Sequence, residues 1–185
     1  REQSGIGERA IAFDFFGRQH ATVEHGEARN GRRRVGRSIR IQTEHQRTVD
    51  LQLRAIADAA GRWPGHVTPT ACIGHAIDPD TDRETFIETT IHETLDAVHA
   101  EFPAVAIDAY CETGAWTFDE TVRLFERAQK LDHPLRMHSD QFNELGMTRW
   151  AAENGAISVD HLEATSGDEL RRLAESDTFG VMLPC

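Results

Sequence analysis

The sequence lacks the features that mark several common classes of protein. Its three cysteines, Cys72, Cys111 and Cys185, are far apart and form no Cys-x-x-Cys pair. This spacing argues against a disulfide scaffold and favours a reducing compartment. No apolar run approaches the ~20 residues of a membrane-spanning helix, and residues 1–16 contain no apolar signal core. We therefore expect a cytoplasmic protein with no membrane partner.

Positive charge and nucleotide-binding loops are also scarce. The formal net charge is −11 over 185 residues, which argues against nucleic acid as a partner. Neither a Gly-x-Gly-x-x-Gly nor a Gly-x4-Gly-Lys-Ser/Thr loop occurs, and no Gly-x-Ser-x-Gly elbow points to a serine hydrolase. The length fits one domain with a sizeable core.

From residue 43 onward, short apolar runs alternate with amphipathic segments. Strands are expected at 67–73, 104–110, 134–137, 156–159 and 179–183, and helices at 49–61, 82–101, 117–131, 147–153 and 170–175. Two of these helices are expected to begin with capping boxes, Thr117 with Glu120 and Ser166 with Glu169. Such alternation is typical of βαβ units with a parallel sheet. It predicts an α/β fold, namely an incomplete (β/α)8 TIM barrel, with a doubly wound open sheet as the alternative.

Five such units do not close a barrel, which takes ~250 residues. We therefore expect the chain to be a piece of a longer protein. Residues 1–42 fit the pattern poorly. Short strands are expected there at 11–16 and 21–24, and a loop with a cluster of arginines at 29–40. The expected division is thus a segment 1–42 and a partial barrel domain 43–185.

Polar or reactive side chains follow the expected strands, at His75, Glu112, His138 and the pair Asp160-His161. Because the carboxyl ends of parallel strands lie at one rim of a sheet, these groups should face a common space. Neutral imidazole is the commonest protein ligand for zinc or iron. The spacing alone leaves open whether these histidines bind a metal or are hydrogen-bonded residues of the rim.

The remaining reactive residues have simpler expected roles. Asp140 and Gln141 follow His138 closely enough to reach the same pocket. Cys111 is expected to be a small buried hydrophobic residue rather than a nucleophile. The other histidines fall on expected helices or loops and should be solvated: His20, His25, His45, His66, His92, His99 and His133.

One block of sequence, MHSDQFNELGMTRWAAENGAISVDHLEATS at 137–166, resembles the signature of the imidazolonepropionase family. That signature is a His-Ala-Asp-Gln/Glu run followed by a Ser-Ala-Asp-His-Leu run. The segments AIDAYCETGAWTFDET, TPTACIGHAIDPD and VMLPC resemble further strands of the same family. The similarity extends from about residue 43 to 185. The family belongs to the metal-dependent amidohydrolase superfamily.

The resemblance implies a (β/α)8 hydrolase that opens the ring of 4-imidazolone-5-propanoate to N-formimidoyl-L-glutamate in histidine degradation. It implies one zinc or iron ion, with His138 as a metal ligand. Gln141 would contact the imidazolone ring and His75 would bind substrate. His161 would assist proton transfer or polarise the carbonyl, so that His161 and Gln141 are the expected catalytic residues. The small-molecule substrate and a homodimer of the full-length protein are the implied partners.

The chain departs from the family at three places. The family's His-x-His pair of metal ligands does not occur in the sequence, and its late Asp ligand would lie beyond residue 185. Of its Lys-Ser-Gly-Tyr-Gly substrate loop, only Ser38 matches, beside Arg37. We therefore expect the 185 residues alone to be inactive. Two alternatives stay open: another cyclic-amide or aminopurine amidohydrolase, or a non-catalytic barrel that binds a partner.

Overall fold

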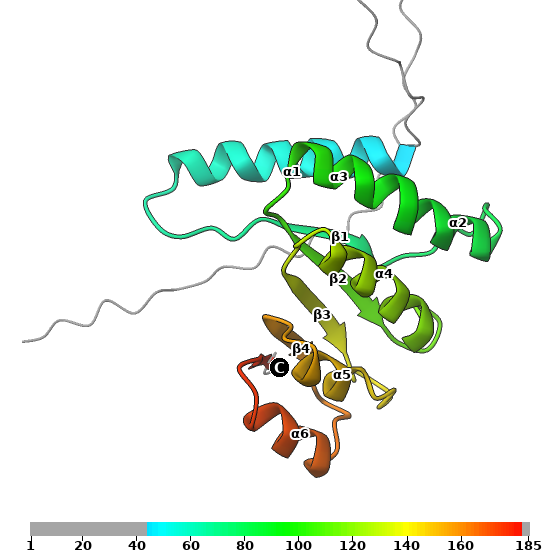
Figure 1. Ribbon diagram of the computed structural model, residues 1–185, viewed down its shortest axis with the longest axis vertical. Coiled ribbons are helices and arrows are strands. Elements are labelled where there is room, and N and C mark those ends of the chain that lie inside the picture. Colours follow the sequence, from blue (N-terminus) through cyan, green and yellow to red (C-terminus); the bar gives the residue numbers. More distant parts are fainter. Residues whose placement is uncertain (1–43, 183–185) are drawn as a thin grey trace, which may run out of the picture.

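A computed structural model describes residues 44–182 of the chain (Figure 1). The helices are α1 (Glu44–Arg62), α2 (Arg83–Thr89), the π-helical turn η1 (Thr90–Thr94), α3 (Leu95–Glu101), α4 (Phe118–Lys130), α5 (Met147–Glu153) and α6 (Gly167–Ala174). The strands are β1 (Thr70–Gly74), β2 (Ala106–Cys111), β3 (Leu135–Ser139), β4 (Ser158–His161) and β5 (Phe179–Val181). The strands expected at 11–16 and 21–24, the arginine cluster, and residues 183–185 lie outside the described range.

The five strands form one parallel sheet in the order of the sequence, β1-β2-β3-β4-β5. Each strand is joined to the next by a helical connection, so that the expected βαβ alternation is confirmed. In this sheet each new strand is added on the same side of the one before, so the strand order never reverses. A doubly wound sheet requires a point at which the strand order reverses. The architecture is that of part of an amidohydrolase-type (β/α)8 barrel.

Most expected strand boundaries lie within about two or three residues of the observed ones. β1 begins at Thr70 rather than at residue 67. Pro69 has no N–H to donate to a neighbouring strand, although its carbonyl accepts from the N–H of Ala106. At the other end of β1, a Cβ on Gly74 would lie 2.6 Å from the Cβ of Ala109. This close approach requires glycine immediately before His75.

Local capping explains where several helices begin. Thr117 and Glu120 form the expected capping box of α4, with both side-chain-to-backbone hydrogen bonds present. The second expected box is only half formed. The hydroxyl of Ser166 accepts from the backbone N–H of Glu169, but the Glu169 carboxylate pairs with Arg149. An ionised partner on α5 competes successfully for this carboxylate.

The long helix expected at 82–101 is observed as a continuous helical run from Arg83 to Glu101 that contains η1. The hydroxyl of Thr90, at the start of η1, donates to the carbonyl of Phe86 over 2.9 Å. Figure 1 shows α1 and α3 side by side at one edge of the described region. Among residues 44–182, no helix combines the length and the apolar character that crossing a bilayer requires.

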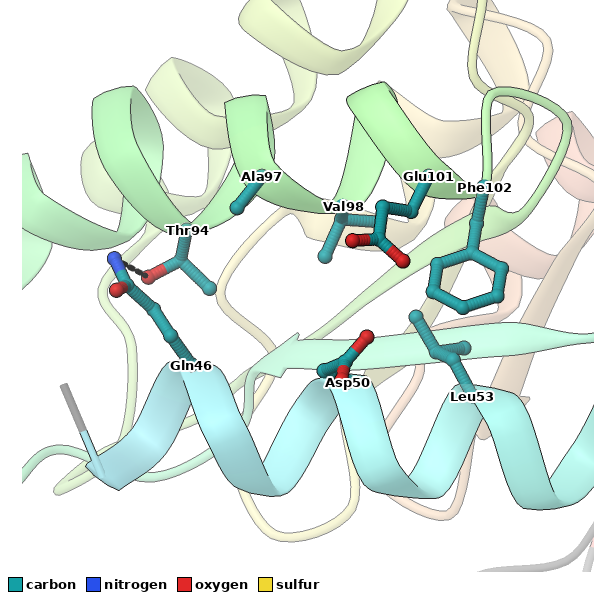
Figure 2. Close-up of a pocket in the computed structure, with 8 residues that line it drawn as sticks. All are labelled: Gln46, Asp50, Leu53, Thr94, Ala97, Val98, Glu101 and Phe102. Atoms are coloured by element: carbon teal, nitrogen blue, oxygen red, sulfur yellow. Dashed lines mark hydrogen bonds between the residues drawn. The ribbon is translucent and has the colours of Figure 1, made fainter. Parts of the chain in front are cut away.

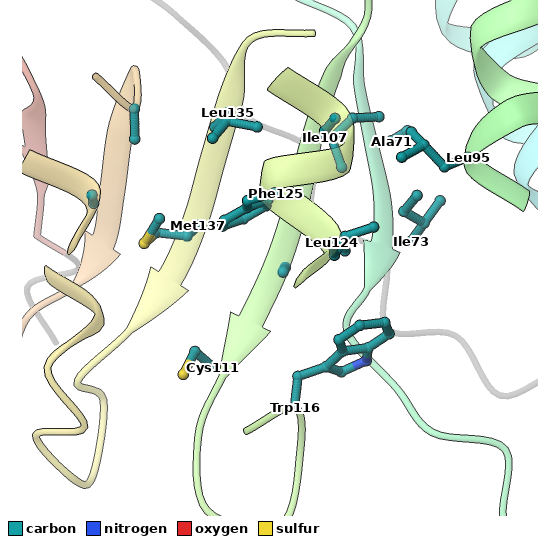
Figure 3. Packing of buried hydrophobic residues seen from close by; sticks show 14 of the residues in the cluster. Ala71, Ile73, Leu95, Ile107, Cys111, Trp116, Leu124, Phe125, Leu135 and Met137 are labelled. Atoms are coloured by element: carbon teal, nitrogen blue, oxygen red, sulfur yellow. The ribbon is translucent and has the colours of Figure 1, made fainter. Parts of the chain in front are cut away.

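The hydrophobic core lies between the sheet and its helices. Figure 3 shows Leu124 and Phe125 of α4 packed near Ile107 of β2 and Met137 of β3. All four side chains are fully buried. Since successive residues of a strand point to opposite faces, Asp108 and Tyr110 face away from α4. The sheet thus has an apolar face towards the helices and a polar face opposite.

Candidate functional site

The candidate site lies at the carboxyl ends of β1, β3 and β4. His75 directly follows β1, His138 is the next-to-last residue of β3, and His161 is the last residue of β4. The ring centroids of His75 and His138 are 4.7 Å apart, and those of His138 and His161 are 5.5 Å apart. The structure therefore brings together the three histidines that the sequence singled out.

Tyr110, which the sequence analysis did not assign to the site, lies among these rings. Its centroid is 6.2 Å from that of His75, 6.5 Å from that of His138 and 6.3 Å from that of His161. Its hydroxyl donates to Oε1 of Gln141 over 2.7 Å. Burial raises the pKa of Tyr110, and the nearby carboxylates of Glu112 and Glu163 raise it further. The phenol is therefore neutral and acts as a hydrogen-bond donor that orients Gln141.

Asp108 of β2 joins two of the histidines, and it too was missed. Its Oδ1 lies 3.1 Å from Nδ1 of His138 and 3.4 Å from Nε2 of His75. Burial acts to raise the pKa of this carboxyl group, but the His138 and His75 rings outweigh burial and hold the pKa well below its usual value. A charged residue in the middle of a buried apolar strand was the available signal, because such a group is rarely buried unless it is paired.

Asp160 approaches His138 from the opposite side. Its Oδ2 lies 3.8 Å from Nε2 of His138, and its Oδ1 is buried without a hydrogen-bond partner. Burial raises the pKa of Asp160, and Asp108 raises it further, although the His138 ring opposes both effects. The two carboxyl groups thus differ: the lowered pKa keeps Asp108 ionised, whereas the raised pKa favours protonation of Asp160.

Two other polar residues at the strand ends stabilise the loop after β3. Glu112 accepts from the backbone N–H groups of Phe142 and Asn143 and from the Asn143 side chain. Asp140 is fully buried and accepts from the hydroxyls of Thr148 and Thr165. The oxygens of both carboxylates accept hydrogen bonds from the protein. The prediction that Asp140 reaches the pocket is wrong, because its hydrogen bonds to these two hydroxyls hold it in the interior. Gln141 remains beside Tyr110, half-buried.

The end of β4 has an unusual backbone. His161 has φ 89° and Leu162 has φ 72°, both in the left-handed region that few non-glycine residues occupy. Nδ1 of His161 lies 3.6 Å from Oε2 of Glu163 and makes no hydrogen bond. Strained backbone of this kind is concentrated at functional sites, which supports a functional role for this histidine.

The donor set at the rim fits a divalent cation. His138 keeps Nε2 directed towards Asp160 while Nδ1 contacts Asp108, and a ligating histidine commonly makes such a second contact to a carboxylate. One further group within residues 44–182, Cys72, His75 and Asp108, has its ligand atoms within 4.8 Å of one another. The described residues can therefore hold a metal ion, and they would do so with carboxylate and imidazole donors.

A concavity lies between α1 and α3, away from the histidine rim (Figure 2). Nε2 of Gln46 donates to the Thr94 hydroxyl over 3.4 Å across it, and Leu53 and Phe102 close its apolar end. It contains no histidine and lies on the outer helix layer, away from the strand ends. We interpret it as a packing gap between two helices.

Among the other reactive residues, His133 and in part His99 depart from the expectations, since His99 is half-buried and its Nδ1 contacts Nε2 of His133. Cys111 is fully buried, and burial raises its pKa to about 12, so it is not a nucleophile. His66 and His92 are exposed, as expected. The prediction that His133 is solvated is wrong: it is 3% exposed, and its two ring nitrogens contact the Val105 carbonyl and His99. Its contacts with His99 of α3 and with Val105, the residue before β2, bury it.

The fold and the rim geometry define the class of the chain: part of an amidohydrolase-type barrel with imidazoles at the ends of β1, β3 and β4. Comparisons with known proteins extend this conclusion. No family model matches the chain. Curated relatives do match, and they are named imidazolonepropionase. The relative from Symbiobacterium thermophilum is 39% identical over 137 residues, which is 72% of this chain and 32% of the relative.

Two further relatives give the same result. The imidazolonepropionase of Herpetosiphon aurantiacus is 38% identical over 141 residues, covering 71% of this chain and 33% of the relative. That of Methylobacterium nodulans is 40% identical over 119 residues, covering 64% of this chain and 30% of the relative. The chain is thus similar to a part of imidazolonepropionase, as the sequence motifs indicated, and it spans about a third of the length of these relatives.

Proposed function

We propose that a protein of the relatives' length containing this chain is a metal-dependent hydrolase. It would open the ring of 4-imidazolone-5-propanoate to N-formimidoyl-L-glutamate in histidine degradation. The observation that carries the proposal is the contact of His75, His138 and His161 at one rim, with Asp108 between the first two. The similarity to proteins named imidazolonepropionase supports the choice of substrate.

His138 is the proposed metal ligand. Its Nδ1–H donates to Asp108, so the ring lone pair lies on Nε2, the nitrogen that faces Asp160. A zinc or iron ion held there would lower the pKa of a bound water towards ~7 and polarise the ring amide. Asp108 fixes the orientation of the imidazole.

His161 is the proposed acid/base. Its ring is 5.5 Å from that of His138 and has an unpaired Nδ1, so it can move a proton between the attacking water and the leaving ring nitrogen. Gln141 is proposed to contact the imidazolone ring, since the Tyr110 hydroxyl occupies its Oε1 and leaves its NH2 group for a substrate oxygen. His75 is the proposed substrate-binding histidine.

The finer parts of the proposal are the division into residues 1–42 and a barrel domain 43–185, a homodimer of the full-length protein, and a cytoplasmic location. The first two rest on the resemblance, and the location rests on the spacing of the three cysteines.

The test compares the full-length protein with variants at the rim. Hydrolysis of imidazolonepropionate is followed for the wild type, His161→Asn and the exposed control His92→Asn. We expect His161→Asn to lower kcat by about 10²–10⁴-fold, as for loss of a general acid/base, and the control to be unchanged. Turnover of another cyclic amide or of an aminopurine in preference to imidazolonepropionate would overturn the substrate. A metal-free full-length protein without turnover that binds a stable partner would overturn the enzyme assignment.

A further inference from the structure

β1 and β2 bring a thiol, an imidazole and a carboxylate to one place on the polar face of the sheet. Sγ of Cys72 lies 3.8 Å from Oδ2 of Asp108, and Nε2 of His75 lies 3.4 Å from Oδ1 of the same carboxylate. The three ligand atoms are all within 4.8 Å of one another. Thr70 and Ala71 of β1 pair with Ala106 and Ile107 of β2, and the register shifts between Ala71 and Gly74. Cys72 and His75 both reach Asp108 across this irregular pair of strands.

These distances suit a tetrahedral ion. Zinc bonds of about 2.0–2.3 Å at tetrahedral angles separate neighbouring ligand atoms by about 3.3–3.6 Å. The separation of 3.4 Å between Nε2 of His75 and Oδ1 of Asp108 lies within that range, and the 3.8 Å between Sγ of Cys72 and Oδ2 of Asp108 lies just above it. Three protein ligands with one open position is the composition of many zinc sites that also bind water or substrate.

A second observation points in the same direction. Nε2 of His75 is buried and makes no hydrogen bond, although it faces the Asp108 carboxylate. The His75 side chain is 11% exposed and that of Asp108 is 6% exposed. A buried ring nitrogen without a hydrogen bond is uncommon in a folded protein, because leaving it unpaired costs free energy. A metal ion between the ring and the carboxylate would satisfy it.

We propose that Cys72, His75 and Asp108 form a binding site for a thiophilic divalent cation such as zinc, separate from the metal that His138 would bind. On binding, the Cys72 thiol releases its proton to solvent and the thiolate coordinates the ion. Oδ2 of Asp108, the oxygen near Cys72, would coordinate the ion, while Oδ1 still accepts from Nδ1–H of His138. His75 would coordinate through Nε2, and its Nδ1 remains available to a substrate. All three ligands belong to the described chain, so the site does not depend on the proposed hydrolase activity.

Cobalt(II) tests this site, because a cobalt–thiolate bond gives an intense near-ultraviolet charge-transfer band that imidazole and carboxylate ligands do not give. The 185-residue chain is titrated with cobalt(II) under thiol-free reducing conditions. We expect one equivalent to produce the band. Cys72→Ser should abolish it, whereas His138→Ala and the matched thiol control Cys111→Ser should retain it. Cys111 is fully buried on the helix-facing side of β2 and cannot reach the ion.

Zinc affinity gives a second measurement, by competition with a chromophoric chelator. Replacing even an outer partner of a metal ligand costs about 10–100-fold in affinity, so we expect Cys72→Ser, which removes a direct ligand, to weaken binding by about 100-fold or more. Circular dichroism checks that each variant is folded. Absence of the band in the folded wild type, or a band and a zinc affinity unchanged in Cys72→Ser, would overturn the site. Neither measurement uses substrate, so failure of the proposed hydrolase would not affect the result.

Discussion

Two histidine pairs in this chain have nearly the same ring geometry at opposite ends of the sheet. The rings of His75 and His138 are 4.7 Å apart at 75°, and those of His99 and His133 are 5.1 Å apart at 80°. The first pair lies at the carboxyl ends of the strands. The second lies at the amino ends, because His133 precedes β3 and contacts Val105, the residue before β2.

The two pairs differ in their partners. His138 and His75 contact the buried carboxylate of Asp108, whereas Nδ1 of His133 contacts the backbone carbonyl of Val105 and its Nε2 contacts His99. A carbonyl and a second ring engage both nitrogens of His133. His138 instead lies between two carboxylates, with Nδ1 at 3.1 Å from Asp108 and Nε2 at 3.8 Å from Oδ2 of Asp160. Ring contact alone therefore does not mark a site; the buried carboxylates beside the rings do.

The largest effect is expected at the carboxyl end. Asp108→Asn removes the charge that both rings face, and breaking a buried pair in this way should lower the free energy of unfolding by about 3 kcal/mol. Asp160→Asn is the matched control. Because burial raises the pKa of Asp160, a neutral amide should change stability by less than about 1 kcal/mol. Urea unfolding at neutral pH measures both. Equal losses in the two variants would show that Asp108 has no special role.

A smaller effect is expected at the amino end. His133→Ala leaves the Val105 carbonyl without its imidazole donor and opens a small cavity, which should cost about 2 kcal/mol. His133→Asn keeps an N–H donor near the position of Nδ1 and should recover part of the loss. The same urea experiment measures both variants. If asparagine were no better than alanine, the Val105 hydrogen bond would not be the stabilising contact.

The smallest expected effect is the pH dependence of stability that comes from His133 in its pair with His99. Burial lowers the pKa of His133 below its usual 6.5, and the nearby His99 lowers it further, although the Val105 carbonyl and Asp132 oppose this. The folded state therefore binds this proton less readily than the unfolded state. The neutral His133 ring therefore contributes its full stability above pH 6.5, the usual pKa of histidine. This stability is lost as the pH falls from 6.5 towards the lower pKa of His133 in the folded state.

Between pH 7.5 and 5.5 we expect the wild type to lose more stability than His133→Asn, which cannot titrate. Parallel stability curves for the two proteins over this interval would contradict a lowered pKa at His133.

The sequence by itself determined the alternation of strands and helices and the position of the histidines on it. Apolar runs of strand length and the Thr117–Glu120 capping box act locally, so the pattern specified α4 and α5 to within one or two residues. It also identified His75, His138 and His161 as strand-end residues, because parallel strands share one rim.

Only the tertiary structure decided which groups these histidines meet. Asp108 and Tyr110 lie inside an apolar strand, and their side chains reach the rim because the register of β2 with β1 and β3 points them to the polar face. The burial of His133 and the use of Asp140 by Thr148 likewise depend on segments that approach through space. Such contacts join residues far apart in the chain, and their free energies depend on distance and burial, which a linear pattern of residue types does not contain.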